Sequence, residues 1–223
     1  EKKLTPGEVV YYNVKDSTGA YILDDCSFKV DDTYSVRTLD VSGVNNVRDI
    51  GGWTAKGGNK VKYGMIYRGG TLAGINSTGK ETLLSSLGVK NEIDLRTDGT
   101  SQLVDSRLTY NKCGMWQYTM VIPGYTSPGA DDDPSVRRGF DYSSTVSIKK
   151  IMEILAKPES YPVYYHCNAG ADRTGTISYI VNGLLGVSYE DLTRDFELTT
   201  YSIYGTRQRS KDNGTSFDES GIY

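Results

Sequence analysis

The sequence has no long hydrophobic run and no excess of positive charge. No stretch approaches the roughly 18 apolar residues that a membrane-spanning helix requires. The 25 Lys and Arg residues against 28 Asp and Glu residues give a formal net charge of −3. Such a chain has no general attraction for nucleic acid or for an anionic membrane surface. We therefore expect no membrane span and no nucleic-acid partner, and a local site must hold any anionic substrate.

Cysteine and histidine are also scarce. The three cysteines, Cys26, Cys113 and Cys167, lie far apart and form no CxxC pair, and His166 is the single histidine. This spacing argues against a zinc site and against a dense disulfide framework. The spacing does not exclude a single disulfide bond between Cys26 and Cys113.

The first 37 residues differ in pattern from the rest of the chain. Short alternating or apolar runs, VVYYNV, AYILDD and FKVDDTY, are separated by the turn formers DSTG and DDCS. The pattern predicts a β-rich N-terminal extension over residues 1–37, followed by one domain over residues 38–223. The β-rich start and the missing initiator methionine favour a processed, exported bacterial protein, and a cytoplasmic protein is the alternative.

From residue 38 onward, strand and helix patterns alternate, which predicts an α/β domain. Strands are expected over 65–67, 89–96 and 162–166. Apolar periodicity predicts helices over about 144–156 and over 177–185. Cap residues predict two more, one that begins after Ser77 or Thr78 and one that begins after Ser188. Gly88 suits the left-handed position that follows a helix. Residues 97–143 are rich in turn formers, which indicates a long loop over a site.

The stretch YYHCNAGADRTGTISYIV, residues 164–181, predicts a strand, a loop and a helix. A loop that joins a strand end to a helix start directs backbone N–H groups and the positive end of the helix dipole at one point. Gly170 lets the backbone approach an oxyanion, and Arg173 can donate to two phosphate oxygens at once. The predicted phosphate-binding residues are Asn168, Ala169, Gly170, Ala171, Asp172 and Arg173.

Cys167 begins this loop, where the amides, the dipole and the guanidinium all favour its thiolate. A thiolate in that position is a nucleophile. A lone cysteine is more often an inert buried residue, but His, Cys, Gly, Arg, Thr and Gly at six fixed positions favour the catalytic interpretation. We expect Thr174 to donate to the sulfur or to help the phosphoenzyme break down, and His166 to anchor the loop through backbone hydrogen bonds.

The motif HCNAGADRTG resembles the HCxxGxxR signature of cysteine-dependent phosphatases of the protein-tyrosine-phosphatase superfamily, and it is closest to a bacterial branch with HCxAGKDRTG. The segments NNVRDIGGW, GMIYRGGTL and VKNEIDLR are similar to further motifs of that family, so the resemblance covers residues 38–200. It implies an α/β domain with a mostly parallel sheet flanked by helices. It also implies a cysteinyl-phosphate intermediate and no metal or other cofactor.

Two departures from the family pattern bear on function. Many relatives carry a general acid in a Trp-Pro-Asp loop, but here Trp53 and Trp116 are followed by Thr54 and Gln117. Ala171 stands where the bacterial branch usually has lysine, so the extra attraction for a multiply phosphorylated inositol is missing. Phosphotyrosine thus becomes the leading substrate.

The general acid has several candidates. Asp172 is the best of them, because myotubularin-like and bacterial lipid-phosphatase signatures also carry an aspartate next to the arginine. Asp94 of the IDLR motif is a rival, although it fits a structural partner of a buried arginine equally well. Asp131, Asp132 and Asp133 are further rivals whose more natural interpretation is a solvated turn.

A second motif, GINSTGKE over residues 74–81, imitates a nucleotide-binding loop but has Glu81 where a hydroxyl should hold Mg²⁺, so we interpret it as a helix start. The sequence therefore predicts a phosphomonoester hydrolase that acts on protein phosphotyrosine or on a small phosphomonoester. The alternatives are a phosphoinositide or inositol-phosphate phosphatase and a pseudoenzyme that only binds phosphotyrosine.

Overall fold

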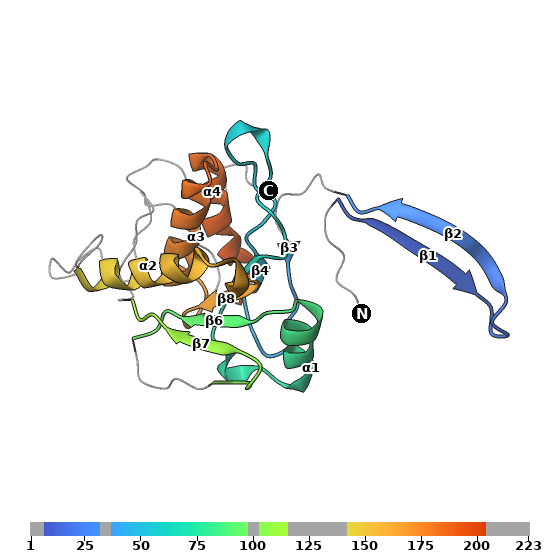
Figure 1. Ribbon diagram of the computed structural model, residues 1–223, viewed down its shortest axis with the longest axis horizontal. Helices are drawn as coiled ribbons and strands as arrows, with labels where there is room; N and C mark the ends of the chain where they lie inside the picture. Colours follow the sequence, from blue (N-terminus) through green and yellow to red (C-terminus); the bar gives the residue numbers. More distant parts are fainter. Residues whose placement is uncertain (1–6, 32–36, 98–102, 116–141, 204–223) are drawn as a thin grey trace.

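The computed structural model describes residues 7–31, 37–97, 103–115 and 142–203. Within these ranges the main part of the chain is an α/β unit with a six-stranded sheet and helices on both faces (Figure 1). The predicted fold class is confirmed. A separate two-stranded sheet precedes this unit.

The strand order of the main sheet is β3-β4-β5-β8-β6-β7. Neighbours from β5 to β7 are parallel, whereas β3 and β4 are antiparallel additions at one edge. The central strand β8 pairs with β5 on one side and β6 on the other, so His166 lies opposite both Gly69 and Asp94. The bounds are β3 Arg37–Thr38, β4 Arg48–Asp49, β5 Ile66–Gly69, β6 Asn91–Asp94, β7 Thr109–Lys112 and β8 Val163–His166.

Each face of this sheet has its own hydrophobic core, because alternate residues of a strand point to opposite faces. On β8, Tyr165 packs in a cluster with Ile151 and Ile177, whereas Tyr164 packs in a cluster with Leu72 and Leu83. The first cluster joins the sheet to α2 and α3, and the second joins it to the segment between β5 and β6. The strand that leads to Cys167 is therefore fixed from both sides.

The helices are α1 Ser77–Lys80, α2 Tyr142–Leu155, α3 Asp172–Leu184 and α4 Tyr189–Glu197. A π-helical turn, η3 Glu81–Ser86, continues α1, and 3₁₀ turns lie at η1 Lys56–Gly58, η2 Leu72–Gly74, η4 Pro158–Ser160 and η5 Leu198–Tyr201. Ser188 caps α4 as predicted, and Gly88 has φ of +67°. The cap predicted at Ser77 or Thr78 is wrong, since the Asn76 side chain accepts from the Gly79 N–H at 2.9 Å.

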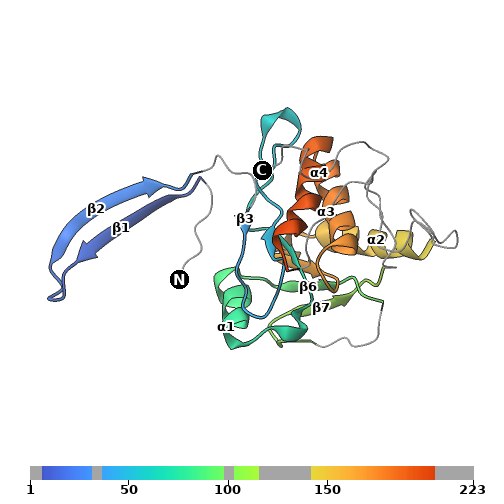
Figure 2. The ribbon, with the colours of Figure 1, turned by 180° about the vertical axis from the view of Figure 1, so that it is seen from behind.

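The β-rich N-terminal extension is a single hairpin of β1 Val9–Lys15 and β2 Tyr21–Lys29. The predicted turn at DDCS is wrong, because those residues continue β2, and Asp25 has a φ of +52° inside the strand. No residue of either strand is buried, and Figures 1 and 2 show the hairpin extending away from the main sheet. The boundary at residues 37 and 38 stays a prediction.

Three further sequence expectations meet the structure only in part. Most of the loop predicted over residues 97–143 lies outside the described residues, including Asp131, Asp132 and Asp133, but its described part contains β7. The three cysteines are free thiols. Among the described helices, none has the length and hydropathy to cross a membrane.

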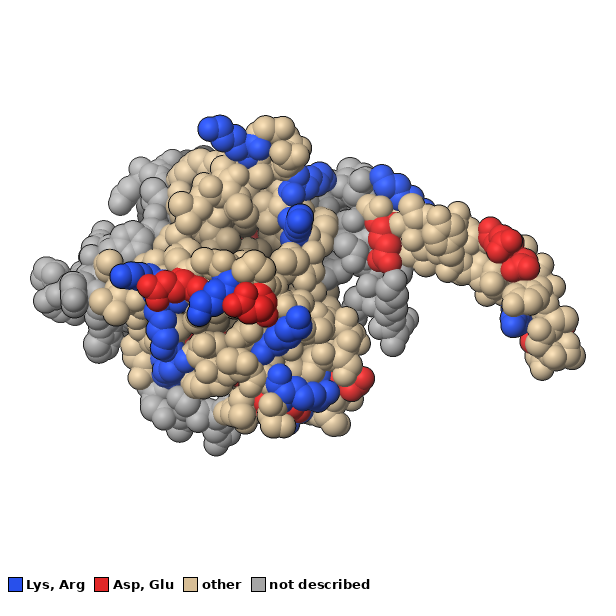
Figure 3. Space-filling view, viewed as in Figure 1, with Lys and Arg blue, Asp and Glu red and all other residues tan. Residues whose placement is uncertain are grey.

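Figure 3 shows both signs of charge interspersed on one face of the main unit.

Candidate active site

The candidate site is the loop of residues 167–171, which joins the end of β8 to the start of α3. The predicted strand, loop and helix are confirmed. Gly170 has φ of +68°, and a Cβ atom there would lie 2.3 Å from the carbonyl carbon of Gly69. Both the left-handed backbone and the close approach to the end of β5 therefore require glycine at this position.

All five carbonyl groups of the loop accept hydrogen bonds from its surroundings. The donors are the His166 ring to Cys167 at 3.0 Å, the Thr71 N–H to Asn168 at 2.9 Å, the Asn46 side chain to Ala169 at 3.1 Å and to Gly170 at 3.0 Å, and the Arg68 side chain to Gly170 at 2.9 Å and to Ala171 at 3.5 Å. The N–H and C=O groups of a trans peptide point in opposite directions. With its carbonyls held outward, the loop directs its N–H groups toward its centre, as an anion site requires.

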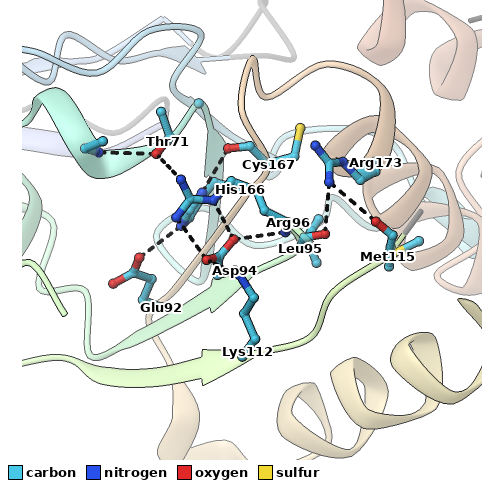
Figure 4. A network of polar contacts seen from close by, with 12 residues as sticks. Thr71, Glu92, Asp94, Leu95, Arg96, Lys112, Met115, His166, Cys167 and Arg173 are labelled. Carbon is cyan, nitrogen blue, oxygen red and sulfur yellow. Dashed lines mark hydrogen bonds and ion pairs between the residues drawn. The ribbon is translucent and has the colours of Figure 1, made fainter. Parts of the chain in front are cut away.

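Cys167 begins the loop and is only 3% exposed. The Thr174 hydroxyl donates a hydrogen bond to its sulfur over 3.2 Å, as the sequence predicts it could. Figure 4 draws the Cys167 side chain at the start of the loop and the Arg173 side chain just after its end, in the first turn of α3. Cys113 differs, because burial raises its pKa to about 11 and so keeps it a thiol at neutral pH. Of these two buried cysteines, only Cys167 lies in the loop between β8 and α3 whose carbonyl groups all accept hydrogen bonds from neighbouring residues.

Arg173 lies in the first turn of α3 and is 6% exposed. Its Nη1 atom donates to the Leu95 carbonyl over 3.5 Å and to the Met115 carbonyl over 3.4 Å (Figure 4). Within the described part of the chain, Nε and Nη2 donate to no acceptor. One nitrogen thus orients the guanidinium, and the other two can donate to a pair of phosphate oxygens.

Arg68, Asn46 and Asp195 support the loop, and the sequence did not identify them as site residues. Arg68 is fully buried and pairs with Asp195 over 2.6 Å while it donates to the loop carbonyls. Arg48 is also buried there; desolvation, with the nearby charge of Arg68, lowers its pKa to about 9. The available signal was an arginine inside the short apolar strand IYRG, because a buried arginine requires a partner.

Arg68 should act as a positioning residue. Arg68→Met leaves Asp195 buried without its partner, and we expect a loss of about 3–5 kcal/mol in the free energy of unfolding. Arg68→Lys keeps the charge but cannot hold both Asp195 and the loop, so we expect stability closer to that of the wild type and a kcat/KM about tenfold lower. Urea unfolding and initial rates measure the two effects. Wild-type kcat/KM in folded Arg68→Lys would show that the arginine only stabilises the fold.

His166 and Glu92 form a buried pair directly behind the loop. Nδ1 of His166 donates to the Cys167 carbonyl over 3.0 Å, and Nε2 lies 2.9 Å from Oε1 of Glu92. These two contacts fix the ring, and the ring in turn holds the start of the loop.

Asp94 and Asp172, the two described candidates for the general acid, have different surroundings. Asp94 is fully buried and accepts from Arg96, Tyr110 and Lys112. Burial would raise the pKa of this carboxyl, but the side-chain and backbone hydrogen bonds from Arg96 hold it well below its usual range. The geometry therefore favours the structural interpretation of Asp94. Asp172 is partly buried at the start of α3, next to Arg173.

A cysteine held with an arginine in an anion-binding loop, after the central strand of a parallel sheet, defines a class: the cysteine-dependent protein-tyrosine-phosphatase superfamily. Within it, the chain belongs to the Tyrosine phosphatase family, whose family model matches residues 39–220.

The chain is similar to a protein of Cupriavidus necator, provisionally named a tyrosine-protein phosphatase, with 23% identity over 69% of this chain and 59% of the relative. A tyrosine-protein phosphatase of Nostoc commune is 27% identical over 62% of this chain and 50% of the relative. The chain thus spans between half and three fifths of the length of these curated relatives.

Two solved structures are also similar. TpbA of P. aeruginosa has 14% identity and a TM-score of 0.47 over 86% of this chain and 89% of that one. The PP-IP phosphatase SIW14 of S. cerevisiae has 19% identity and a TM-score of 0.43 over 61% of this chain and 71% of that one.

Proposed function

We propose that the protein hydrolyses phosphomonoesters through a cysteinyl-phosphate intermediate and that its substrate is protein phosphotyrosine. The arrangement around the Cys167 sulfur supports this: a hydroxyl donor at 3.2 Å, a buried arginine in the first turn of the helix that follows the loop, and a loop whose carbonyls are all held outward. We also propose that residues 38–223 are the phosphatase domain, of the bacterial HCxAGKDRTG branch, and that residues 1–37 are an extension of it.

In the proposed reaction the loop N–H groups and Arg173 bind the phosphate dianion. The Cys167 thiolate attacks phosphorus, an S–P bond forms, and the bond to the tyrosine oxygen breaks. Asp172 donates its proton to that oxygen as it leaves. Water then attacks the phosphocysteine, Asp172 accepts a proton from it, and inorganic phosphate and the thiolate are released. The hydrogen bond from Thr174 stabilises the departing thiolate.

The preference for phosphotyrosine rests on charge. Ala171 is fully buried and uncharged, so this position adds no cation for the further phosphates of an inositol ring. The names of the two curated relatives, both tyrosine-protein phosphatases, support the same choice. A phosphoinositide or inositol phosphate is the alternative substrate, and pure phosphotyrosine binding is the alternative to catalysis. An exported location stays a prediction that fractionation of the source cells can test.

A kinetic panel tests the substrate class. We expect kcat/KM for phosphotyrosine peptides to exceed that for phosphoserine peptides by at least about 100-fold, because a flat ring lets phosphate reach a recessed cysteine. We expect soluble inositol phosphates to be poorer substrates than phosphotyrosine peptides as well. Faster turnover of an inositol phosphate would favour the alternative substrate, and no turnover of any ester would favour the binding module.

The same panel, repeated with two aspartate variants, tests which aspartate is the general acid. Asp172→Asn should lower kcat for phosphotyrosine by about 100-fold and much less for para-nitrophenyl phosphate, whose leaving group needs no proton. Asp94→Asn is the matched control, and it should lower the thermal midpoint while keeping the wild-type ratio between the two substrates. The reverse pattern would make Asp94 the acid.

A further inference from the structure

A cavity of about 500 Å³ lies away from the phosphate-binding loop. The loop that joins β4 to β5, the start of β5, Tyr161 just before β8, and Leu185 after α3 all contribute to its lining. The phosphate-binding loop follows the other end of β8 and precedes the other end of α3. Since α3 has 13 residues, about 20 Å of helix separates the two sites. The cavity is therefore not part of the candidate active site.

The lining combines an apolar floor with a cationic mouth. Ile50 and Ile66 are buried at the floor, and the side chains of Lys56, Lys60 and Lys62 are exposed at the mouth. No carboxylate is among the described residues that line the cavity. The loop over residues 51–65 has no acidic residue at all, and the part of the unit that it forms in Figure 1 carries blue but no red side chains in Figure 3.

Two of the three lysines at the mouth have no acidic partner among the described residues. Neither Lys56 nor Lys62 forms an ion pair with a described residue. Lysine stems often lie along apolar surface with the ammonium group in water, but here they leave about 500 Å³ open beneath them. This volume lies in the range of small-molecule binding pockets, about 300–1,000 Å³.

The loop that carries the lysines is held against α3. The Lys56 N–H donates to the Leu185 carbonyl over 3.3 Å, and the Ala55 N–H donates to the Asn59 carbonyl over 2.6 Å, which closes the loop on itself. Gly186 has φ of +80°, and a Cβ atom there would lie 2.6 Å from the Lys56 Cβ. The contact is close enough to require glycine, so the cavity is formed by packed structure on both sides.

We propose that this cavity binds a small amphiphilic anion, with its apolar body on the isoleucine floor and its single anionic head group among the three lysines. A neutral apolar molecule makes no use of the lysines, and a hydrophilic polyanion makes no use of the floor. A long-chain carboxylate has both parts. The proposal does not depend on phosphatase activity, because it concerns a separate site.

Binding of dodecanoate to the intact chain, measured by calorimetry below its micellar concentration, tests the proposal. Inorganic phosphate is present in excess to occupy the phosphate-binding loop. We expect saturable binding of one dodecanoate per chain. We also expect affinity to fall by about 15-fold for each pair of methylenes removed, since each buried methylene contributes about fourfold. Dodecyltrimethylammonium, with the same tail and the opposite charge, should bind at least about tenfold more weakly.

Matched variants locate the site. Lys56→Glu with Lys62→Glu should weaken dodecanoate at least about tenfold. Lys90→Glu with Lys149→Glu changes the net charge equally, outside the cavity lining, and should have little effect. Leu185→Trp should fill the mouth and weaken binding, whereas Leu184→Trp, one residue earlier and 75% exposed, should not.

The phosphatase assay serves as the folding control, because all of these variants should hydrolyse para-nitrophenyl phosphate like the wild type. The proposal is wrong if dodecanoate shows no saturable binding, if the cationic amphiphile binds equally well, or if each matched pair of variants binds alike. Loss of activity in the catalytic variants has no bearing on this result.

Discussion

Replacing Cys167 with serine should abolish hydrolysis of para-nitrophenyl phosphate and of phosphotyrosine peptides. A serine hydroxyl has nearly the same volume as the thiol but stays protonated at neutral pH, so no nucleophile remains to attack phosphorus. The loop and Arg173 are unchanged, and phosphotyrosine peptide should therefore still bind with near wild-type affinity. Initial rates and calorimetry measure the two quantities on the same protein.

Cys113→Ser is the matched control for this substitution. Cys113 is equally buried, but burial raises its pKa to about 11 and no anion-binding loop surrounds it. The change should cost some stability and leave kcat near the wild-type value. If Cys167→Ser keeps substantial hydrolysis, or if Cys113→Ser removes it, the proposed mechanism is incorrect.

Arg173→Lys should lower kcat/KM by about 10³-fold or more, the scale of losing an arginine that stabilises a transferring phosphoryl group. A lysine ammonium is a point charge that cannot keep the contacts to the Leu95 and Met115 carbonyls and also donate to two phosphate oxygens. We expect both a lower kcat and a higher KM in steady-state assays. This pattern differs from that of Cys167→Ser, which removes chemistry but spares binding.

Arg107→Lys provides the control for the loss of a guanidinium. Arg107 pairs with Asp105 at 2.9 Å, and its side chain is 54% exposed, whereas that of Arg173 is buried. Replacement of Arg107 should leave kcat/KM within about twofold of wild type, since surface ion pairs contribute little. Equal and small effects of the two substitutions would show that Arg173 does not contact the reacting phosphate.

The loop and its neighbouring elements could be predicted from the sequence because their signals are local. The strand that ends at His166, Gly170 in a left-handed conformation and the apolar stripe of α3 all lie within about twenty consecutive residues. Strand and helix periodicity reports directly on such a segment. Cys167 and Arg173 thus lie at the two ends of one short loop, as their spacing across a strand–loop–helix junction indicates.

The residues that support the loop, Asn46, Arg68 and Asp195, could not be predicted in the same way. Asn46 bonds to Gly170 from 124 positions away, and Arg68 bonds to Asp195 from 127 positions away. Periodicity reports nothing about such pairings, although a polar residue in an apolar strand indicates that some partner exists. Asp94 shows the same limit: the sequence left two roles open, and only the contacts from Arg96, Tyr110 and Lys112 favour the structural one.

Two predictions of local structure were wrong, the cap of α1 and the turn at DDCS, and each error comes from a few neighbouring residues. Asn76 competes with Ser77 and Thr78 for the start of α1, and all three are good cap residues, so sequence alone cannot choose among them. The run DDCS contains turn formers, yet pairing with β1 carries the chain through it as an irregular strand.

The most direct test is to mix wild-type protein with para-nitrophenyl phosphate, quench in acid within milliseconds and analyse the peptides by mass spectrometry. We expect one phosphate on the sulfur of Cys167, in an amount that matches the nitrophenol released in the first turnover. Phosphate on another residue, or rapid turnover with no covalent intermediate, would contradict it.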